Sequence, residues 1–197
     1  MKKAFLTLVL FIVSSLFVFA EEISFGPPVI TSVERSTDDE SRMYVYFDFE
    51  TVSGGGEKAE VKLFDSEMRE IDSKTVGRSR KNEKKTFFKP SSSGTYYIEV
   101  LGIRGDEEIS SGVYEIVWTY PLFSPVASAV NQGDNTIRLS WNEIKEADGY
   151  LVRMNGEEYR TKECEMIFSG LQSGVKYSFS VSSIRKDEIR EGETIYK

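Results

Sequence analysis

Short stretches in which apolar and polar residues alternate recur along this chain, and they constrain its fold more than any other feature. Such stretches lead from Met43 to Phe49, from Ala59 to Leu63 and from Ile137 to Trp141. Clusters of glycine, asparagine and serine separate them, and no long segment has the i, i+3, i+4, i+7 apolar spacing of a helix. The pattern predicts an all-β protein made of antiparallel sandwiches, in which each strand turns one face to a core and the other to water.

The alternating stretches fall into two consecutive modules. The first is expected to span residues 27–120 and the second residues 123–197, and prolines precede the first strand of each. Residues 121–125 contain two prolines and no glycine. This composition predicts a short, stiff linker, with Leu122 or Phe123 packed at the domain contact.

The second module carries residues with a recognisable order and spacing. Trp141 ends one strand, Asp148-Gly149-Tyr150 opens the next, and Leu171 precedes Tyr177 by six positions. These residues resemble the fibronectin type III family, in which a tryptophan fills the core and a tyrosine corner bonds back to the backbone. The resemblance implies a second module of that fold, with Trp141, Tyr150, Leu171 and Tyr177 in its core.

The first module resembles the same family less closely. Phe47 stands in place of the tryptophan and Tyr96 in place of the corner tyrosine, and both are expected in the core. We interpret this module as a diverged fibronectin type III domain or a generic immunoglobulin-like sandwich. Its middle part is longer than that of the second module, so residues 74–89 are expected to form an extended loop.

The end of the chain departs from the family pattern. After Ser183 a short hairpin through Glu191-Gly192 is expected, and the last strand, residues 194–197, is very short. Either the final edge is incomplete or the chain is a fragment.

The first twenty residues have the layout of a bacterial secretory signal peptide. Lys2 and Lys3 precede an almost wholly apolar stretch, and Ala20 is the expected cleavage site. We therefore expect export to the periplasm, the cell surface or the medium. Association with a membrane is expected only if the segment stays uncleaved as an anchor.

Composition excludes several classes of function. The chain has no histidine, which removes histidine-based acid–base catalysis, serine triads and most zinc sites. Its 25 basic and 32 acidic residues give a net charge of −7, and removal of Lys2 and Lys3 would make it −9, so nucleic acid is not an expected partner. Cys164, the single cysteine, is expected as a buried apolar side chain. We predict no enzyme, no cofactor and no metal site.

Two segments are candidates for contact with a partner. Arg104-Gly105-Asp106 is expected in the loop between the last two strands of the first module, where the integrin-binding module of fibronectin carries the same tripeptide. The alternative is an ordinary solvated turn. The second segment is a basic stretch, expected in the extended loop and suited to sulfated glycans or anionic lipid, or else to balancing acidic neighbours. Its members are Arg78, Arg80, Lys81, Lys84 and Lys85.

These observations favour a non-catalytic exported protein that binds or spaces other molecules at the cell envelope. The expected partner is a protein or a glycan. Two alternatives remain open: a host-receptor adhesin that uses Arg104-Gly105-Asp106, and an accessory docking subunit of a larger envelope complex. Fold alone does not decide among them.

Overall fold

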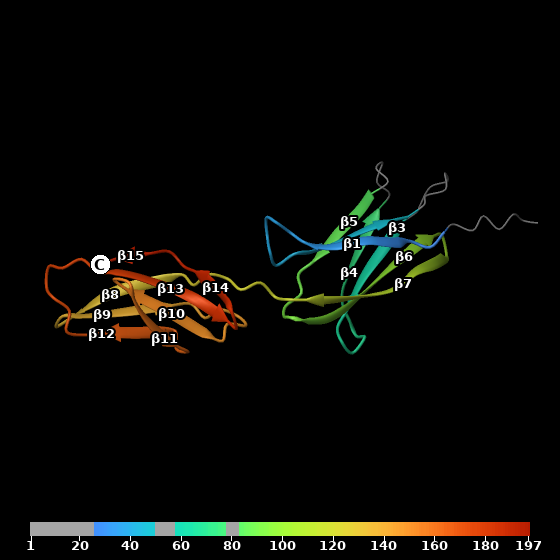
Figure 1. Cartoon of the computed structure of the whole chain (residues 1–197). Helices are drawn as coiled ribbons and strands as arrows, with labels where there is room; N and C mark the ends of the chain where they lie inside the picture. Colours follow the sequence, from blue (N-terminus) through green and yellow to red (C-terminus); the bar gives the residue numbers. More distant parts are fainter. Residues whose placement is uncertain (1–25, 50–57, 78–82) are drawn as a thin grey trace, which may run out of the picture.

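The chain folds into two β-sandwiches that follow one another along the sequence (Figure 1). The computed structural model describes residues 26–49, 58–77 and 83–197. The expected signal peptide lies outside the described residues, as do Arg78, Arg80 and Lys81 of the basic stretch. Within the described ranges every regular element is a strand. The prediction of an all-β fold with two tandem sandwiches is therefore confirmed.

The first sandwich packs a three-stranded sheet against a four-stranded one. Its strands are β1 Val29–Arg35, β2 Met43–Asp48, β3 Lys58–Phe64, β4 Glu70–Gly77, β5 Glu83–Phe88, β6 Gly94–Arg104 and β7 Glu107–Trp118. The sheet orders are β1-β2-β5 and β4-β3-β6-β7, with antiparallel neighbours throughout. Alternate side chains of β2, β3 and β6 point inwards and form one core, because successive residues of a strand face opposite ways.

The second sandwich repeats this topology. Its strands are β8 Ala127–Gly133, β9 Thr136–Trp141, β10 Gly149–Met154, β11 Glu157–Thr161, β12 Glu165–Phe168, β13 Ser178–Arg185, β14 Glu188–Glu191 and β15 Ile195–Tyr196. One sheet has the order β12-β9-β8, and the other has the order β11-β10-β13 with β14 and β15 both paired to β13. The equivalence of the two strand orders makes the chain an internal repeat.

The final strand of the second sandwich is present in two pieces. The hairpin expected between Ser183 and Gly192 is present: β13 pairs with β14 from Ser182 and Glu191 to Arg185 and Glu188, with the turn between Arg185 and Glu188. Gly192 interrupts the strand: its N–H donates to the Val181 carbonyl at 3.0 Å. A Cβ on Gly192 would lie 2.5 Å from that carbonyl oxygen and 2.7 Å from the Pro125 carbonyl oxygen. Only glycine fits between these two backbone segments.

The residues expected in the two cores differ in burial. Phe47, Tyr96, Trp141 and Tyr150 are buried. Leu171 and Tyr177 are half-buried and pack against the second core. Tyr177 precedes β13, and its phenol reaches back to the loop before that strand.

Both modules have a tyrosine that bonds back to the chain. The phenol oxygen of Tyr177 accepts the Gln172 N–H at 2.9 Å, and the phenol of Tyr96 donates to the Ser92 carbonyl at 2.9 Å. Each bond fixes the loop that leads into the strand. Cys164 is half-buried and packs against the second core.

The prediction of an extended loop at residues 74–89 is wrong, because most of the segment belongs to β4 and β5. In β5 the side chains of Lys84, Thr86 and Phe88 turn inwards, while Lys85 and Phe87 turn out. Because one inward position of β5 holds a lysine, the segment lacks the alternation of apolar and polar residues that normally identifies a strand. Lys84 is only 3% exposed, and its ammonium lies 4.7 Å from the centre of the Phe49 ring.

Candidate functional site

A network of polar contacts joins the two sandwiches, and Glu146 lies at its centre. We call this network, together with the linker, the joint. This residue belongs to the loop between β9 and β10. Its carboxylate accepts the Ser93 N–H at 2.6 Å and the Ser93 hydroxyl, both from the first sandwich. It also pairs with the Arg185 guanidinium at 3.2 Å. The Ser93 hydroxyl in turn accepts the N–H of Tyr120, the residue directly before the linker, at 2.7 Å.

Residues of the linker are fixed by the second sandwich. Leu122 is 1% exposed and belongs to the second core. Arg185 donates to the Tyr120 carbonyl at 2.7 Å, and the Ser183 hydroxyl donates to the Phe123 carbonyl at 2.6 Å. Phe123 itself is exposed and makes an edge contact with the Tyr120 ring. The buried Leu122 side chain and the bonds to the Tyr120 and Phe123 carbonyls therefore hold the linker against the second sandwich.

An ion pair also crosses between the two sandwiches. Arg190 pairs with Glu40 at 2.9 Å. The Arg35 guanidinium fixes the Glu40 backbone by donating to its carbonyl at 2.7 Å, and it also donates to the Thr119 carbonyl. The same guanidinium lies over the Trp118 ring, 4.1 Å from the ring centre. The joint thus has two anchors, one at Glu146 and one at Glu40. Glu188 connects them, because its carboxylate pairs with Arg185 at 2.8 Å and with Arg190 at 3.6 Å.

The contacts of the Glu146 carboxylate with Ser93 and Arg185 are expected to weaken in acid, when the carboxylate is protonated. Partial burial by itself raises the pKa of the Glu146 carboxyl, but the hydrogen bonds from Ser93 and the charges of Arg185 and Lys145 outweigh it and leave the pKa below its ordinary value. A lowered pKa means that the anchor is fully formed above the ordinary glutamate pKa of about 4.3 and is lost as the pH falls below it. Small-angle scattering from pH 7 to pH 3 should show the joint loosening over that window. A Glu146→Gln chain should lack this pH-dependent step, and an identical step in that chain would contradict the assignment.

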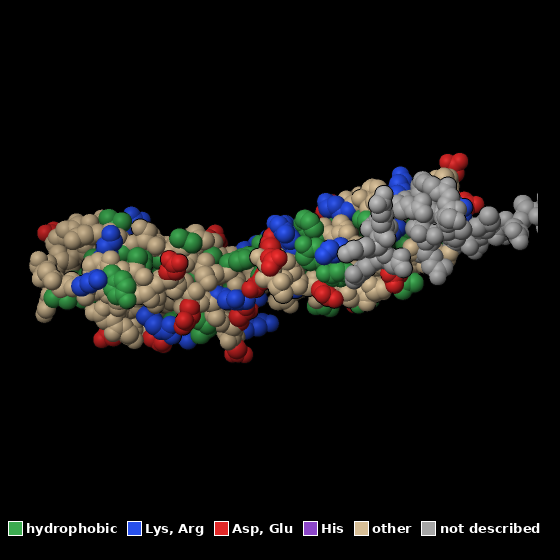
Figure 2. Space-filling model, turned by 90° about the horizontal axis from the view of Figure 1, so that it is seen from above, with side chains coloured by type: hydrophobic (Ala, Val, Ile, Leu, Met, Phe, Trp, Pro, Cys, Tyr) green, Lys and Arg blue, Asp and Glu red, His purple; other side chains and the backbone are tan. Residues whose placement is uncertain are grey.

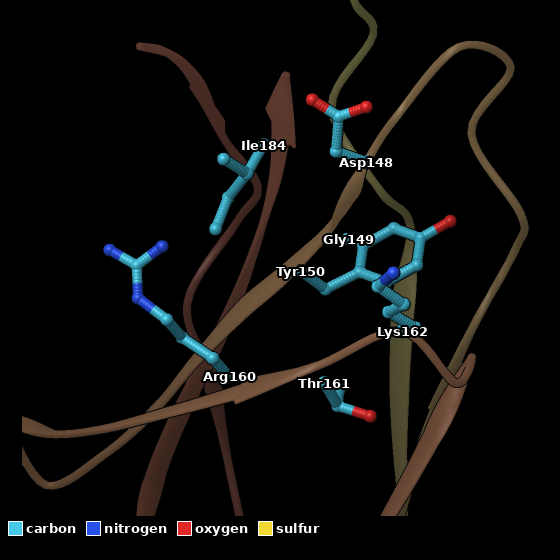
Figure 3. Close-up of a pocket in the computed structure, with 7 residues that line it drawn as sticks. All are labelled: Asp148, Gly149, Tyr150, Arg160, Thr161, Lys162 and Ile184. Carbon is cyan, nitrogen blue, oxygen red and sulfur yellow. The ribbon is translucent and has the colours of Figure 1, made fainter. Parts of the chain in front are cut away.

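A hollow of about 390 Å³ lies on the second sandwich, beside the joint (Figure 3). Gly149 and Ile184 form its base, because they are paired neighbours on β10 and β13. Arg160, Lys162 and Asp148 surround them, and Figure 3 shows the Arg160 guanidinium and the Asp148 carboxylate on either side of Ile184. Gly149 is required here, since a Cβ on it would lie 2.9 Å from the Thr161 carbonyl oxygen.

The groups around the hollow suit binding of an anion better than catalysis. Asp148 already accepts the Lys186 N–H at 2.8 Å. Tyr150 is occupied as well: burial raises the pKa of its phenol, whose oxygen accepts the Ile144 N–H at 2.8 Å. Arg160 and Lys162 make no ion pair with any described residue. No sequence motif pointed to this hollow, because its residues come from three separate strands and the loops beside them.

Comparisons with known proteins agree with this architecture. The sequence matches no protein-family model and no curated protein. A two-domain fibronectin type III segment of chicken tenascin superposes on 87% of this chain and 98% of its own, with a TM-score of 0.50 and 14% identity. The chain has the tandem fibronectin type III fold. The chicken interferon gamma receptor alpha chain is similar in the same way, over 88% of this chain and 98% of its own, with a TM-score of 0.51 and 13% identity. Identity this low establishes the fold and nothing about a ligand.

In fibronectin type III terms, β1 to β7 are strands A, B, C, C′, E, F and G, and Arg104-Gly105-Asp106 lies at the F–G hairpin. The loop between these strands is shorter than expected, because β6 ends at Arg104 and β7 begins at Glu107 rather than near Gly112. Gly105 takes φ 59°, as the first central residue of a type II′ turn does. Gly105 and Asp106 are exposed, and neither Arg104 nor Asp106 has an ion pair within the described residues.

The described part of the basic stretch does not form one cationic surface. Lys84 is buried between the sheets of the first fibronectin type III domain, so its expected contact with an external partner is wrong. Lys85 is exposed, but it lies on strand β5 rather than in a loop. Its ammonium lies 5.3 Å from the ring centre of Tyr44 and 5.6 Å from that of Tyr46. Aromatic residues therefore surround it, which the order of residues along the chain does not show.

The described residues contain no candidate metal cluster and no candidate membrane-spanning helix. In residues 26–49, 58–77 and 83–197 no three potential metal ligands come together. The same residues include no helix of the length and apolarity needed to span a bilayer.

Proposed function

We propose that this protein is an exported bacterial protein that binds and spaces other molecules at the cell envelope and catalyses no reaction. The single observation that carries the proposal is the joint between the two domains. A tandem pair with a mobile linker serves as a tether, whereas a pair anchored at Glu146 and at Glu40 holds its two ends at a fixed separation. Fixed separation is what a spacer or adaptor requires.

The distribution of groups also supports a role without catalysis. The hollow beside the joint offers two cations and an apolar base, but its tyrosine and its carboxylate are both engaged in structural hydrogen bonds. A general base or nucleophile needs a free group within reach of the substrate. The layout of the first twenty residues supports export.

Host-receptor adhesion through the F–G hairpin is a second candidate, favoured by the exposure of Gly105 and Asp106 at the tip of a rigid turn. Glu107 and Glu108 follow directly and are exposed as well, which opposes approach of an acidic receptor. An adhesin must be displayed outside the cell, whereas a spacer or docking subunit can act in the periplasm.

Protease treatment of intact cells that express the full chain tests the proposal. We expect a mature product that begins after Ala20 and is found in the envelope fraction. Cleavage from outside would place the domains at the surface and allow adhesion, while protection until the outer envelope is opened would place them in the periplasm and exclude it. Recovery of an unprocessed chain in the cytoplasm would contradict the proposed function.

A further inference from the structure

The outer surface of the β1-β2-β5 sheet carries an unusual group of side chains. Tyr44 and Tyr46 of β2 and Phe87 of β5 all point away from the core, and we call this group, together with Lys85, the aromatic face. Tyr44 and Phe87 are paired in register, with ring centres 5.7 Å apart in an edge contact. The rings of Tyr44 and Tyr46 are 6.1 Å apart. The solvent side of a sandwich sheet is normally polar, so three adjoining rings there call for a partner.

The cations around the aromatic face differ in how far they are neutralised. Arg42 lies over the Phe87 ring at 4.9 Å and pairs with Asp39 at 3.1 Å. Lys89 pairs with the same carboxylate at 3.0 Å. Lys85 lies over the two tyrosines and has no carboxylate partner among the described residues. Figure 2 views this side of the molecule and shows Lys and Arg side chains around a hydrophobic group over the β1-β2-β5 sheet.

We propose that the aromatic face binds an acidic polysaccharide. A carboxylate or sulfate of the polymer pairs with Lys85, and the apolar C–H groups of its sugar rings pack against the parts of Phe87 and Tyr44 that Arg42 and Lys85 leave uncovered. The hydroxyls of Tyr44 and Tyr46 provide hydrogen bonds for the sugar hydroxyls.

The position of the rings favours a sugar over a peptide. An extended peptide binds to a sheet mainly through backbone hydrogen bonds at an open edge. Tyr44 and Tyr46 lie on β2, whose backbone is already paired on both sides by β1 and β5. A ligand on this face can use side chains alone. Adjoining rings with two hydroxyls, beside a lysine that has no ion-pair partner among the described residues, suit a charged sugar polymer.

The proposal names a ligand for the binding half of the proposed function and therefore rests on it. Its failure would leave the spacing role standing, because that role depends on Glu146 and Glu40 rather than on Lys85.

Titration calorimetry with three polymers tests the proposal directly. Carboxymethyl-dextran carries both sugar rings and carboxylates, dextran carries the rings alone, and polyglutamate carries the carboxylates alone. We expect binding of carboxymethyl-dextran at about 0.15 M salt and weaker binding at about 1 M salt, where screening is stronger. Binding of dextran or polyglutamate should be at least about tenfold weaker, the loss expected when one class of contact is missing. Equal binding of polyglutamate would overturn the proposal in favour of an acidic peptide.

Variants locate the site and separate it from general charge effects. Lys85→Ala, and Tyr44→Thr combined with Phe87→Thr, should each weaken carboxymethyl-dextran binding about tenfold. The matched control is Lys176→Ala with Tyr196→Thr, which removes an exposed lysine lying 4.6 Å over a single tyrosine ring on the second domain. The control should bind like the parent, and all chains should keep the parent's melting temperature within a few degrees. If no polymer binds the parent, or if the Lys85 and Tyr44 variants bind as the control does, the aromatic face is not the site.

Discussion

Trp141→Ala is expected to lower the melting temperature of the second domain and to leave that of the first unchanged. The side chain is 7% exposed and makes an edge contact with the Tyr150 ring, with centres 5.4 Å apart. Truncating a buried tryptophan costs about 3–5 kcal/mol, which in a domain of this size lowers the melting temperature by at least about 10 °C. The first domain has its own core, which does not include Trp141, so its transition should stay in place.

The two tryptophans make the measurement specific to each domain. Trp118 belongs to the first core and Trp141 to the second. Thermal unfolding followed by calorimetry should show one transition of the Trp141→Ala chain displaced and the other unchanged. Trp118→Ala is the reciprocal control and should displace the other transition. If both transitions move together in either variant, the two cores do not fold as independent units.

The strands that sequence reasoning located are those with apolar residues on alternate positions. Met43, Val45 and Phe47 point inwards from β2, as the period of two requires. The same pattern does not identify β5 as a strand, because one of its inward positions holds Lys84 instead of an apolar residue. The pattern also does not reveal the break at Gly192 in the final strand, because a close approach of two other backbone segments is not visible in local sequence.

The functional surfaces were harder to predict, because they depend on contacts between distant segments. Ser93 and Glu146 are separated by 53 positions, and neither belongs to a motif. The aromatic face left a weak local signal in Tyr44 and Tyr46, whose spacing of two places them on one side of a strand. Their link to Lys85 follows only from the pairing of β2 with β5, which the sequence does not reveal.

Removing the Glu146 anchor should convert the rigid pair of domains into a flexible one. The Glu146→Ala, Arg185→Ala double variant loses two hydrogen bonds from Ser93 and the bond from Arg185 to the Tyr120 carbonyl. If these contacts together contribute about 2 kcal/mol, the ratio of closed to open joints falls about thirty-fold. Both domains should keep their melting transitions, since neither residue belongs to a core cluster.

Distances between spin labels measure this change. With Cys164 replaced by serine, labels at the exposed positions Val113 and Ile167 report one distance between the domains. The parent should give a narrow distance distribution and the double variant a broad one. The matched control is Arg153→Ala with Glu158→Ala, which removes the ion pairs of Arg153 with Glu158 at 2.9 Å and with Glu191 at 3.1 Å, both within the second domain, and should leave the distribution narrow. A double variant as narrow as the parent would mean that Arg190–Glu40 and the linker suffice, whereas a parent already broad would remove the basis for a spacing role.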